Sequence, residues 1–300
     1  MIIDAHAHIF QHVSGIYKGL PLHGAGLGAA VAGDERIQLL PPSHERSDSA
    51  YEVLLRYMDW QGVDKAILLP NALYGYHNDY VIEAVRMHPE RFRGVALVDI
   101  FKGSQAVSEL ATLHAKGLFG LKIEVCSAFS GNETTPLDGD PLIPVWEYCD
   151  NTRQFVFLHI YRKNDFSALV RLCKRYRGIS FIVCHLGAEA ILGDVKQRDD
   201  IFNSFLDFLL DHSSVTVDIS AVCCQFPQEE YPFATANTYI RRAYETIGSK
   251  RILWGSDYPG ILTKKTYLQS IDQFRKHFTD LPLSDMASIL GGNAQRMFFD

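Results

Sequence analysis

The feature that most constrains this chain is a repeated alternation of short, apolar, β-branched segments with longer segments of helical periodicity. Because a helical segment follows each apolar one, consecutive strands are expected to run parallel and to be joined by helical crossovers. Segments such as FVFLHI and ISFIVCHL are almost continuously apolar, which is typical of parallel strands buried on both faces. The predicted strands are Met1–Ala5, Lys65–Leu69, Phe92–Val98, Leu118–Val125, Phe155–His159, Ile179–Cys184, Val215–Ile219 and Arg251–Gly255.

The intervening segments complete eight strand–helix units. The predicted helices are Tyr51–Trp60, Asp79–Met87, Ser104–Lys116, Leu142–Asn151, Phe166–Tyr176, Asp199–Leu210, Ala234–Ile247 and Lys264–Phe278. Eight such units favour a (β/α)8 TIM barrel, an α/β fold, over an open, doubly wound sheet. A doubly wound sheet usually carries a glycine-rich phosphate loop after its first strand, whereas the residues after Ile3 read DAHAHIF.

The length of 300 residues fits a single barrel domain spanning 1–300. Barrels of this kind need about 250 residues, so the excess is expected in insertions. Two long loops are predicted, Gln11–Glu45 after the first strand and Cys126–Pro141 after the fourth, together with a C-terminal helical tail, Ser284–Asp300. The first loop is rich in glycine and has no clear periodicity. Both loops follow strands, and barrels place their active sites on that face.

Charge and targeting signals narrow the class of protein. The formal net charge is −6 and no basic cluster stands out, which argues against nucleic-acid binding. The chain opens with MIIDAHAHIF, which has neither the segments of a secretory signal nor a long apolar run that would span a membrane. The 6 cysteines form no CxxC pair and lie in apolar surroundings, as in reduced proteins. We therefore expect a cytoplasmic protein that acts on a small molecule and binds neither nucleic acid nor membranes.

Histidine and aspartate stand where several predicted strands meet their following loops. His6 and His8 alternate at the end of the first strand, so both imidazoles are expected on one side of it. His159 ends the fifth strand, His185 ends the sixth, and Asp257 follows the eighth. Imidazole and carboxylate ligands together suit Zn²⁺ or a similar first-row divalent ion. The pattern therefore predicts a metal site at the carboxyl ends of the strands.

Taken together, these motifs resemble the amidohydrolase superfamily. The segments that carry the resemblance are DAHAH, LHI, CHLG and GSDYP, and it extends from GVDKAILLP near the second strand to the closing GGNAQRMF. More narrowly, the chain resembles the amidohydrolase-related group that includes aminocarboxymuconate-semialdehyde decarboxylase and several sugar and aromatic lactonases. The resemblance implies a barrel with one metal ion held by His6, His8, His159 and Asp257. It also implies that His185 lies beside the metal as an acid/base or substrate-polarising group.

The chemistry of these side chains is consistent with the implied roles. A divalent ion lowers the pKa of its bound water to about 7 and so supplies hydroxide at neutral pH. Asp257 would accept the proton from that water and return it to the leaving group, while His185 would stabilise a developing oxyanion. Zn²⁺ is the favoured ion, with Mn²⁺ as the alternative.

Three classes of function are compatible with the motifs. The first, which we favour, is a metal-dependent hydrolase that opens a lactone or cleaves another carbonyl–heteroatom bond in a small polar substrate. The second is a metal-dependent, non-oxidative decarboxylase (a carboxy-lyase) of an aromatic or unsaturated carboxylic acid. The third is a non-catalytic barrel, which is disfavoured because structural zinc sites are usually closed shells rich in cysteine.

A lysine and a glutamate on the predicted fourth strand bear on the number of metal ions. Lys122 and Glu124 share one face of that strand by parity. Binuclear members of the resembled superfamily often use a carboxylated lysine at this strand to bridge two ions. We expect instead that these side chains contribute to polar packing in the barrel, so a second metal is not expected.

Substrate contacts are sought beside the proposed ligands. Tyr161 and Arg162 directly follow the end of the fifth strand, and Tyr258 directly follows Asp257. An arginine near the metal could hold a substrate carboxylate in a bidentate pair. These three residues are the predicted substrate-binding residues. The resemblance is also compatible with a homodimer or a homotetramer.

Overall fold

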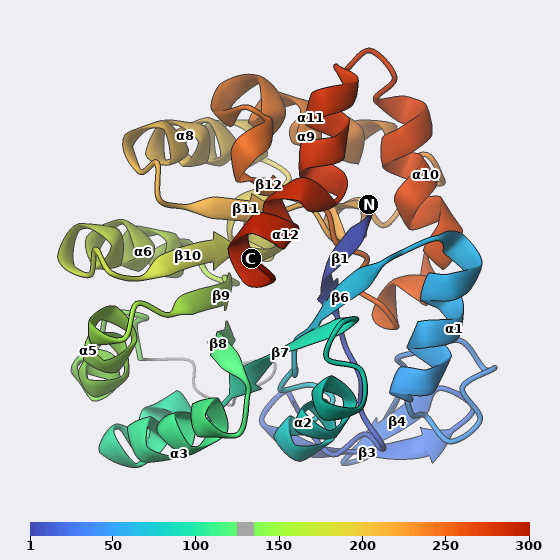
Figure 1. Ribbon diagram of the computed structural model, residues 1–300, viewed down its shortest axis with the longest axis vertical. Coiled ribbons are helices and arrows are strands. Elements are labelled where there is room, and N and C mark those ends of the chain that lie inside the picture. The colour runs from blue at the N-terminus through green and yellow to red at the C-terminus, as the bar shows by residue number, and fades with distance from the viewer. Residues whose placement is uncertain (125–134) are drawn as a thin grey trace.

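The computed structural model describes residues 1–124 and 135–300, which form a barrel of parallel strands surrounded by helices (Figure 1). The strands lie side by side in the order β1-β6-β7-β8-β9-β10-β11-β12, which is also their order along the chain. Their bounds are β1 Ile3–Ala7, β6 Lys65–Leu68, β7 Phe92–Leu97, β8 Phe119–Glu124, β9 Phe155–His159, β10 Ser180–Val183, β11 Thr216–Asp218 and β12 Ile252–Leu253. The predicted (β/α)8 TIM barrel is therefore confirmed.

Backbone hydrogen bonds between the first and last strands bring the sheet close to a complete ring. The N–H of Asp257 donates to the carbonyl of His6 at 2.8 Å, and the N–H of His8 donates to the carbonyl of Tyr258 at 2.7 Å. Both β11 and β12 are shorter than the segments predicted for them. The end of β1 therefore lies beside the turn that follows β12.

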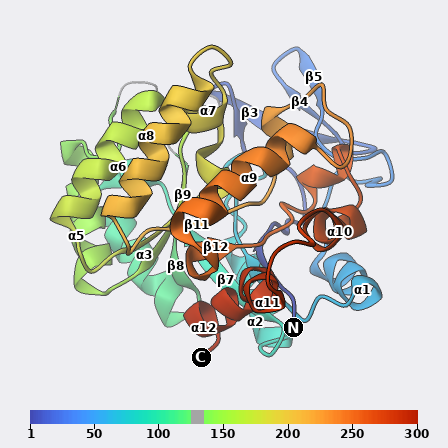
Figure 2. The ribbon, with the colours of Figure 1, turned by 90° about the horizontal axis from the view of Figure 1, so that it is seen from above.

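Helices cover the outside of the barrel and lie between successive strands (Figures 1 and 2). The predicted helices are present with small shifts at their ends: α1 Tyr51–Gln61, α2 Asn78–Met87, α3 Ser104–Ala115, α5 Ile143–Asn151, α6 Lys163–Arg175, α8 Arg198–Asp211, α9 Ala234–Ile247 and α10 Tyr267–His277. The helical tail consists of α11 Leu283–Ala287, a π-helical turn at Ser288–Gly292, and α12 Asn293–Phe298. None of the helices in the described part of the chain is long and apolar enough to cross a membrane.

The interior of the barrel is apolar at the end where the strands begin. The side chains that form this inner core are Ile3, Ala5, Ile67, Leu69, Val95, Phe157, Ile182, Cys184 and Leu253. Phe298 packs against them from α12, which lies across this end of the barrel in Figure 1. Because the amino-terminal end is closed by apolar packing, the buried polar side chains gather at the opposite end, where the strands finish.

The long segment between β1 and α1 is not the irregular loop that its composition predicts. It forms an antiparallel sheet of four strands, β2 Ile16–Tyr17, β3 Leu20–Gly26, β4 Ala29–Ala32 and β5 Glu35–Gln38. These strands are short, and β3 and β4 are rich in alanine and glycine, so the segment lacks the apolar alternation that marks a strand in sequence. Gly28 has a φ of +72°, and a Cβ there would lie 2.3 Å from the carbonyl oxygen of Leu40. Of the second predicted loop, residues 126–134 lie outside the described residues.

Candidate active site

The two histidines at the end of β1 lie together and are buried. Their ring centroids are 5.0 Å apart and their planes are nearly perpendicular. Nδ1 of His8 lies 2.5 Å from the carbonyl oxygen of Leu69, so this nitrogen is the donor. The other ring nitrogen, Nε2, faces the site and lies 3.1 Å from Oδ1 of Asp257.

His6 presents a second nitrogen to the same space. Its Nδ1 hydrogen-bonds Oδ2 of Asp218 at 2.9 Å, and its Nε2 has no hydrogen-bond partner among the described residues although it is buried. Burial lowers the pKa of His6 well below its usual value, and the nearby ammonium of Lys122 lowers it further. The imidazole is therefore neutral, with its Nε2 lone pair unused.

Asp257 faces both imidazoles from the turn after β12. Its Oδ1 lies 3.1 Å from Nε2 of His8 and 3.7 Å from Nε2 of His6. The residue has a φ of +67°, a left-handed conformation that aspartate tolerates better than most residues. Its pKa lies well below the usual range because the neighbouring histidines outweigh the effect of burial, which alone would raise it. The carboxylate is therefore charged.

The three side chains fit a divalent cation. One ligand atom from each of His6, His8 and Asp257 lies within 4.8 Å of the others. A buried imidazole nitrogen without a donor is rare in native proteins, and here it lies beside a charged carboxylate and a second imidazole. A cation would satisfy all three groups at once, and nitrogen and oxygen donors of this kind suit Zn²⁺ or Mn²⁺.

Asp218 at the end of β11 is a site residue that the sequence analysis missed. Its Oδ2 accepts from Nδ1 of His6, and its Oδ1 accepts from the backbone N–H of His185 at 3.1 Å. Neighbouring His6 holds the pKa of this carboxyl far below its usual range, although burial alone would raise it. A carboxylate that fixes the outer nitrogen of a ligand histidine is a common support for metal sites. The available signal was an aspartate at the end of the apolar run VTVD.

His185 lies beside the candidate ligands, as its position at the end of β10 predicts. Its ring centroid is 4.5 Å from that of His6 and 4.6 Å from that of His159. Its Nδ1 contacts the carbonyl oxygen of Ser220 at 3.0 Å and the hydroxyl of Ser220 at 2.9 Å. Burial lowers the pKa of His185, so the ring is neutral and its Nε2 is available to the site.

His159, the fourth ligand that the family resemblance implies, lies at the rim of this cluster. Its Nδ1 is 3.0 Å from the hydroxyl of Tyr161, and the two rings stack at 4.0 Å. Nδ1 also lies 4.0 Å from Oε1 of Glu124 on the neighbouring strand. The metal-ligand role of His159 stays a prediction, because the two close donor sets among the described residues, His6–His8–Asp257 and His6–His185–Asp218, do not include it.

The other two predicted substrate-binding residues have strong contacts of their own. Arg162 forms a bidentate pair with Asp165, at 2.7 and 3.0 Å, at the start of α6. The ring of Tyr258 is buried and lies 5.6 Å from that of Tyr57 on α1 and 5.9 Å from that of Tyr267 on α10. The substrate-binding roles of Arg162, Tyr161 and Tyr258 stay predictions.

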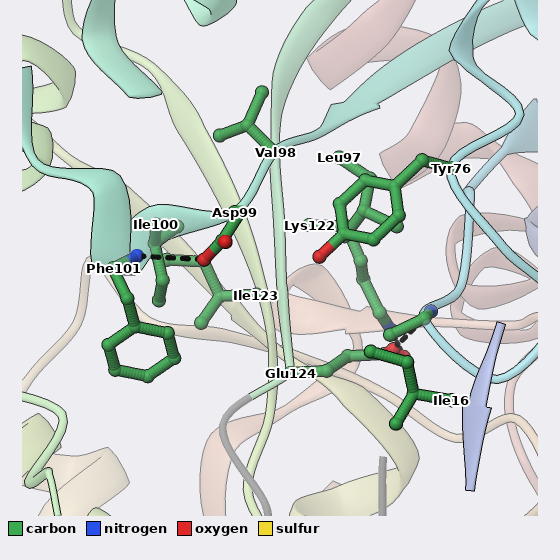
Figure 3. Close-up of a pocket in the computed structure, with 11 residues that line it drawn as sticks. Ile16, Tyr76, Leu97, Val98, Asp99, Ile100, Phe101, Lys122, Ile123 and Glu124 are labelled. Atoms are coloured by element: carbon green, nitrogen blue, oxygen red, sulfur yellow. Dashed lines mark hydrogen bonds and ion pairs between the residues drawn. The ribbon is translucent and has the colours of Figure 1, made fainter. Parts of the chain in front are cut away.

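Lys122 and Glu124 of β8 point into the barrel, as their parity predicts. Nζ of Lys122 lies 3.4 Å from Sγ of Cys184 and 3.7 Å from Oε1 of Glu124. Glu124 also accepts a hydrogen bond from the backbone N–H of Ala72 at 2.8 Å. Figure 3 shows both side chains in the wall of a pocket, with Tyr76 and Asp99 around its mouth. Since the register pairs Glu124 with His159, this pocket adjoins the histidine cluster.

The barrel and the cluster of histidines and aspartates at its carboxyl end define a metal-binding class of TIM-barrel protein. The chain belongs to the amidohydrolase family, whose model matches residues 3–299. That family is metal-dependent and points to an enzyme, either a hydrolase or a decarboxylase. No curated protein matches the sequence at a significant level.

Several solved structures share this fold at low sequence identity. One is a protein from Acinetobacter baumannii described as a probable 2-pyrone-4,6-dicarboxylic acid hydrolase with citric acid bound (18% identity, TM-score 0.73, covering 99% of this chain and 98% of that chain). Another is an amidohydrolase from Burkholderia multivorans with bound zinc (15% identity, TM-score 0.75, covering 99% of this chain and 98% of that chain). A third is a dihydroxybenzoic acid decarboxylase from Polaromonas sp. JS666 with bound manganese and an inhibitor (20% identity, TM-score 0.62, covering 82% of this chain and 85% of that chain). These similarities concern the fold.

Proposed function

We propose that the protein is a metal-dependent hydrolase that opens a lactone or cleaves another carbonyl–heteroatom bond in a small polar substrate. The observation that carries this proposal is the unpartnered Nε2 of His6, which lies beside Nε2 of His8 and the charged carboxylate of Asp257. A divalent ion bound there, Zn²⁺ in preference to Mn²⁺, supplies hydroxide at neutral pH by lowering the pKa of its water to about 7.

Asp257 and His185 would then have different roles in the reaction. The side chain of Asp257 is 22% exposed, so its carboxylate can accept a proton from the attacking water and deliver it to the leaving oxygen. His185, whose Nδ1 donates to the carbonyl oxygen of Ser220, would direct the lone pair of its Nε2 towards the site and act there as an acid/base group. His159 is proposed as a further ligand, and Tyr161 as a neighbouring substrate contact.

Proton release and carbon dioxide release distinguish hydrolysis from the alternative reaction. The purified, metal-loaded protein would be incubated with a panel of lactones and with a panel of carboxylated phenols. Ring opening of a lactone releases a proton without CO₂, and this is the expected result. Release of CO₂ from a carboxylated phenol would replace the proposal with the decarboxylase. Activity that survives thorough chelation would contradict metal catalysis in either form.

Metal analysis tests the ligand assignment separately. We expect His6→Ala and Asp257→Asn each to lose most of the bound metal, because each removes one of three closely spaced donors. The exposed Asp207→Asn in α8 is a matched control that removes a carboxylate far from the site in sequence and fold. Full metal occupancy in both site variants would contradict the assignment.

A further inference from the structure

A pocket beside the histidine cluster contains an acceptor that no described residue satisfies. The pocket lies where β7 and β8 end, and its polar lining consists of Tyr76, Asp99, Lys122 and Glu124. Oε1 of Glu124 is buried and has no hydrogen-bond partner among the described residues, although the side chain is only 1% exposed. A buried carboxylate oxygen without a donor is costly, which makes this atom a candidate ligand-binding group.

The other oxygen of Glu124 fixes how the carboxylate is oriented. Oε2 accepts from the backbone N–H of Ala72 at 2.8 Å. Oε1 is consequently turned towards the pocket, where Nζ of Lys122 lies 3.7 Å away and Nδ1 of His159 lies 4.0 Å away. Both distances are longer than a hydrogen bond. The carboxylate of Glu124 therefore stands between His159 and the pocket that it lines, and offers an acceptor to a group bound there.

The charges around this oxygen favour a donor over an anion. Lys122 is fully buried in the barrel, where the carboxylates of both Glu124 and Asp218 lie close enough to act on its ammonium. Its positive charge is thus balanced within the protein. Burial, together with the carboxylates of Asp99 and Glu124, raises the pKa of Tyr76 to about 12, as expected in an acidic pocket. Figure 3 shows the Tyr76 hydroxyl directed between those two carboxylates.

Arg162, which the sequence predicts as a substrate contact, does not offset the negative charge of this pocket. Arg162 follows His159 by three positions, but its guanidinium is held by Asp165 in a bidentate pair. A bidentate arginine–carboxylate pair is already charge-neutral and geometrically satisfied. A substrate carboxylate in the pocket would therefore face Glu124 and Asp99 without a matching free cation on Arg162.

We infer that this pocket receives a hydrogen-bond-donating group of the substrate, a hydroxyl or an ammonium, and that Glu124 is the residue that selects it. The inference rests on the proposed function in placing the reacting carbonyl at the histidine cluster. It adds that the substituent next to that carbonyl is neutral or cationic. Substrates with a carboxylate at this position are excluded by the unsatisfied, negatively charged Oε1.

Replacement of Glu124 by glutamine inverts this preference with little change in shape. The glutamine carbonyl oxygen must keep the hydrogen bond from the N–H of Ala72, so its amide NH₂ faces the pocket in place of Oε1. The substitution also removes a negative charge beside Lys122. Glu124→Gln is therefore expected to bind donors less well and carboxylates better than the wild type.

Matched lactams test the inference by binding alone, without any chemical step. The probes are pyroglutaminol, its amine analogue in which the hydroxyl is replaced by an ammonium, and pyroglutamate, which carries a carboxylate on the same ring. Their dissociation constants would be measured by calorimetry or ligand-observed NMR on the metal-loaded protein. We expect the wild type to bind the hydroxyl or ammonium ligand at least about 10-fold more tightly than pyroglutamate, and Glu124→Gln to lose or reverse that ratio.

Controls separate this result from general damage and from the proposed reaction. Glu90→Gln removes the same charge at an exposed position just before β7, at the opposite end of the barrel, and should keep the wild-type ratio. Equal or tighter binding of pyroglutamate by the wild type, binding of none of the ligands, or an unchanged ratio in Glu124→Gln would overturn the inference. A failure of the protein to hydrolyse any lactone would count against the proposed function and leave the lactam ratios to decide this inference.

Discussion

Two buried polar clusters lie at the carboxyl end of this barrel, and they differ in how the charge of their buried carboxylate is balanced. The cluster on β8 pairs the ammonium of Lys122 with the carboxylate of Glu124 at 3.7 Å. The cluster at the seam of β1 and β12 contains a carboxylate, Asp257, and two imidazoles, His6 and His8. The first cluster carries its own cation, whereas the second has donor atoms arranged around a space in which a cation belongs.

The difference between the clusters bears on the number of metal ions. A buried carboxylate needs a compensating positive charge or several hydrogen bonds. Asp257 lies mainly among imidazoles, with the buried ammonium of Lys265 also acting on it, and we expect an external cation to complete the set. Glu124 already has a lysine nearby, which makes a second divalent ion electrostatically redundant. We therefore expect one ion at the seam and none on β8.

The largest expected effect comes from breaking the seam cluster. Asp257→Asn removes both a metal ligand and the group proposed to move the proton. We expect kcat/KM for the lactone substrate to fall by about 10³-fold or more, with loss of bound metal. Steady-state kinetics and elemental analysis on the same preparations check both effects. A variant that kept its metal and lost less than about 10-fold in kcat/KM would remove Asp257 from both roles.

The next effect is on stability and comes from breaking the cluster on β8. Lys122→Met leaves the carboxylates of Glu124 and Asp218 without their buried counter-ion, so the free energy of unfolding should fall by about 3–5 kcal/mol. Urea unfolding measures the change, and the double variant Lys122→Met/Glu124→Gln should recover part of it. The exposed Lys116→Met is the matched control, for which about 0–1 kcal/mol is expected.

The same double variant sharpens the comparison of the two clusters. Its metal content should equal that of the wild type, because neither Lys122 nor Glu124 belongs to the close donor sets of the described residues. A fall in metal content from two equivalents to one would show that the β8 cluster holds an ion, contrary to the single-ion argument.

A third, intermediate effect concerns Asp218, which hydrogen-bonds the outer nitrogen of His6 in the seam cluster. Asp218→Asn keeps the shape of the side chain but removes the charge that faces Nδ1 of His6. Metal affinity should fall by about 10–100-fold, as is typical when the partner of a ligand histidine is changed. Competition with a chelator measures the affinity. An unchanged affinity would mean that Asp218 serves only the packing of β11 against β10.

The fold was predictable because its signal is repeated and local. Each strand of a parallel barrel is buried on both faces, so it must be short and apolar, and each crossover must be an amphipathic helix. The site was predictable in part for the same reason, since the ends of parallel strands converge on one face. His6, His8, His185 and Asp257 all reach that face.

What the sequence could not show depends on contacts between distant segments. Asp218 looks like any acidic residue at the end of a strand until its contact with Nδ1 of His6 is known. The antiparallel sheet between β1 and α1 consists of short strands without clear periodicity, and it is fixed by tight turns and by packing on Phe10 and Tyr74. The bidentate pair between Arg162 and Asp165 likewise changes the role available to that arginine.

The smallest expected effect comes from the hydroxyl of Ser220, and it tests whether Asp218 and His185 are held in place independently. The Ser220 hydroxyl contacts both Nδ1 of His185 and a carboxylate oxygen of Asp218, but the Ser220 carbonyl oxygen also lies 3.0 Å from the same nitrogen. Ser220→Ala therefore leaves His185 with a backbone acceptor and leaves the hydrogen bond between His6 and Asp218 intact. We expect kcat/KM to fall by about 5-fold, equivalent to about 1 kcal/mol, with metal affinity unchanged. A loss of metal affinity as large as that of Asp218→Asn would instead show that the hydroxyl holds Asp218 in place, so that His6 and His185 share one support.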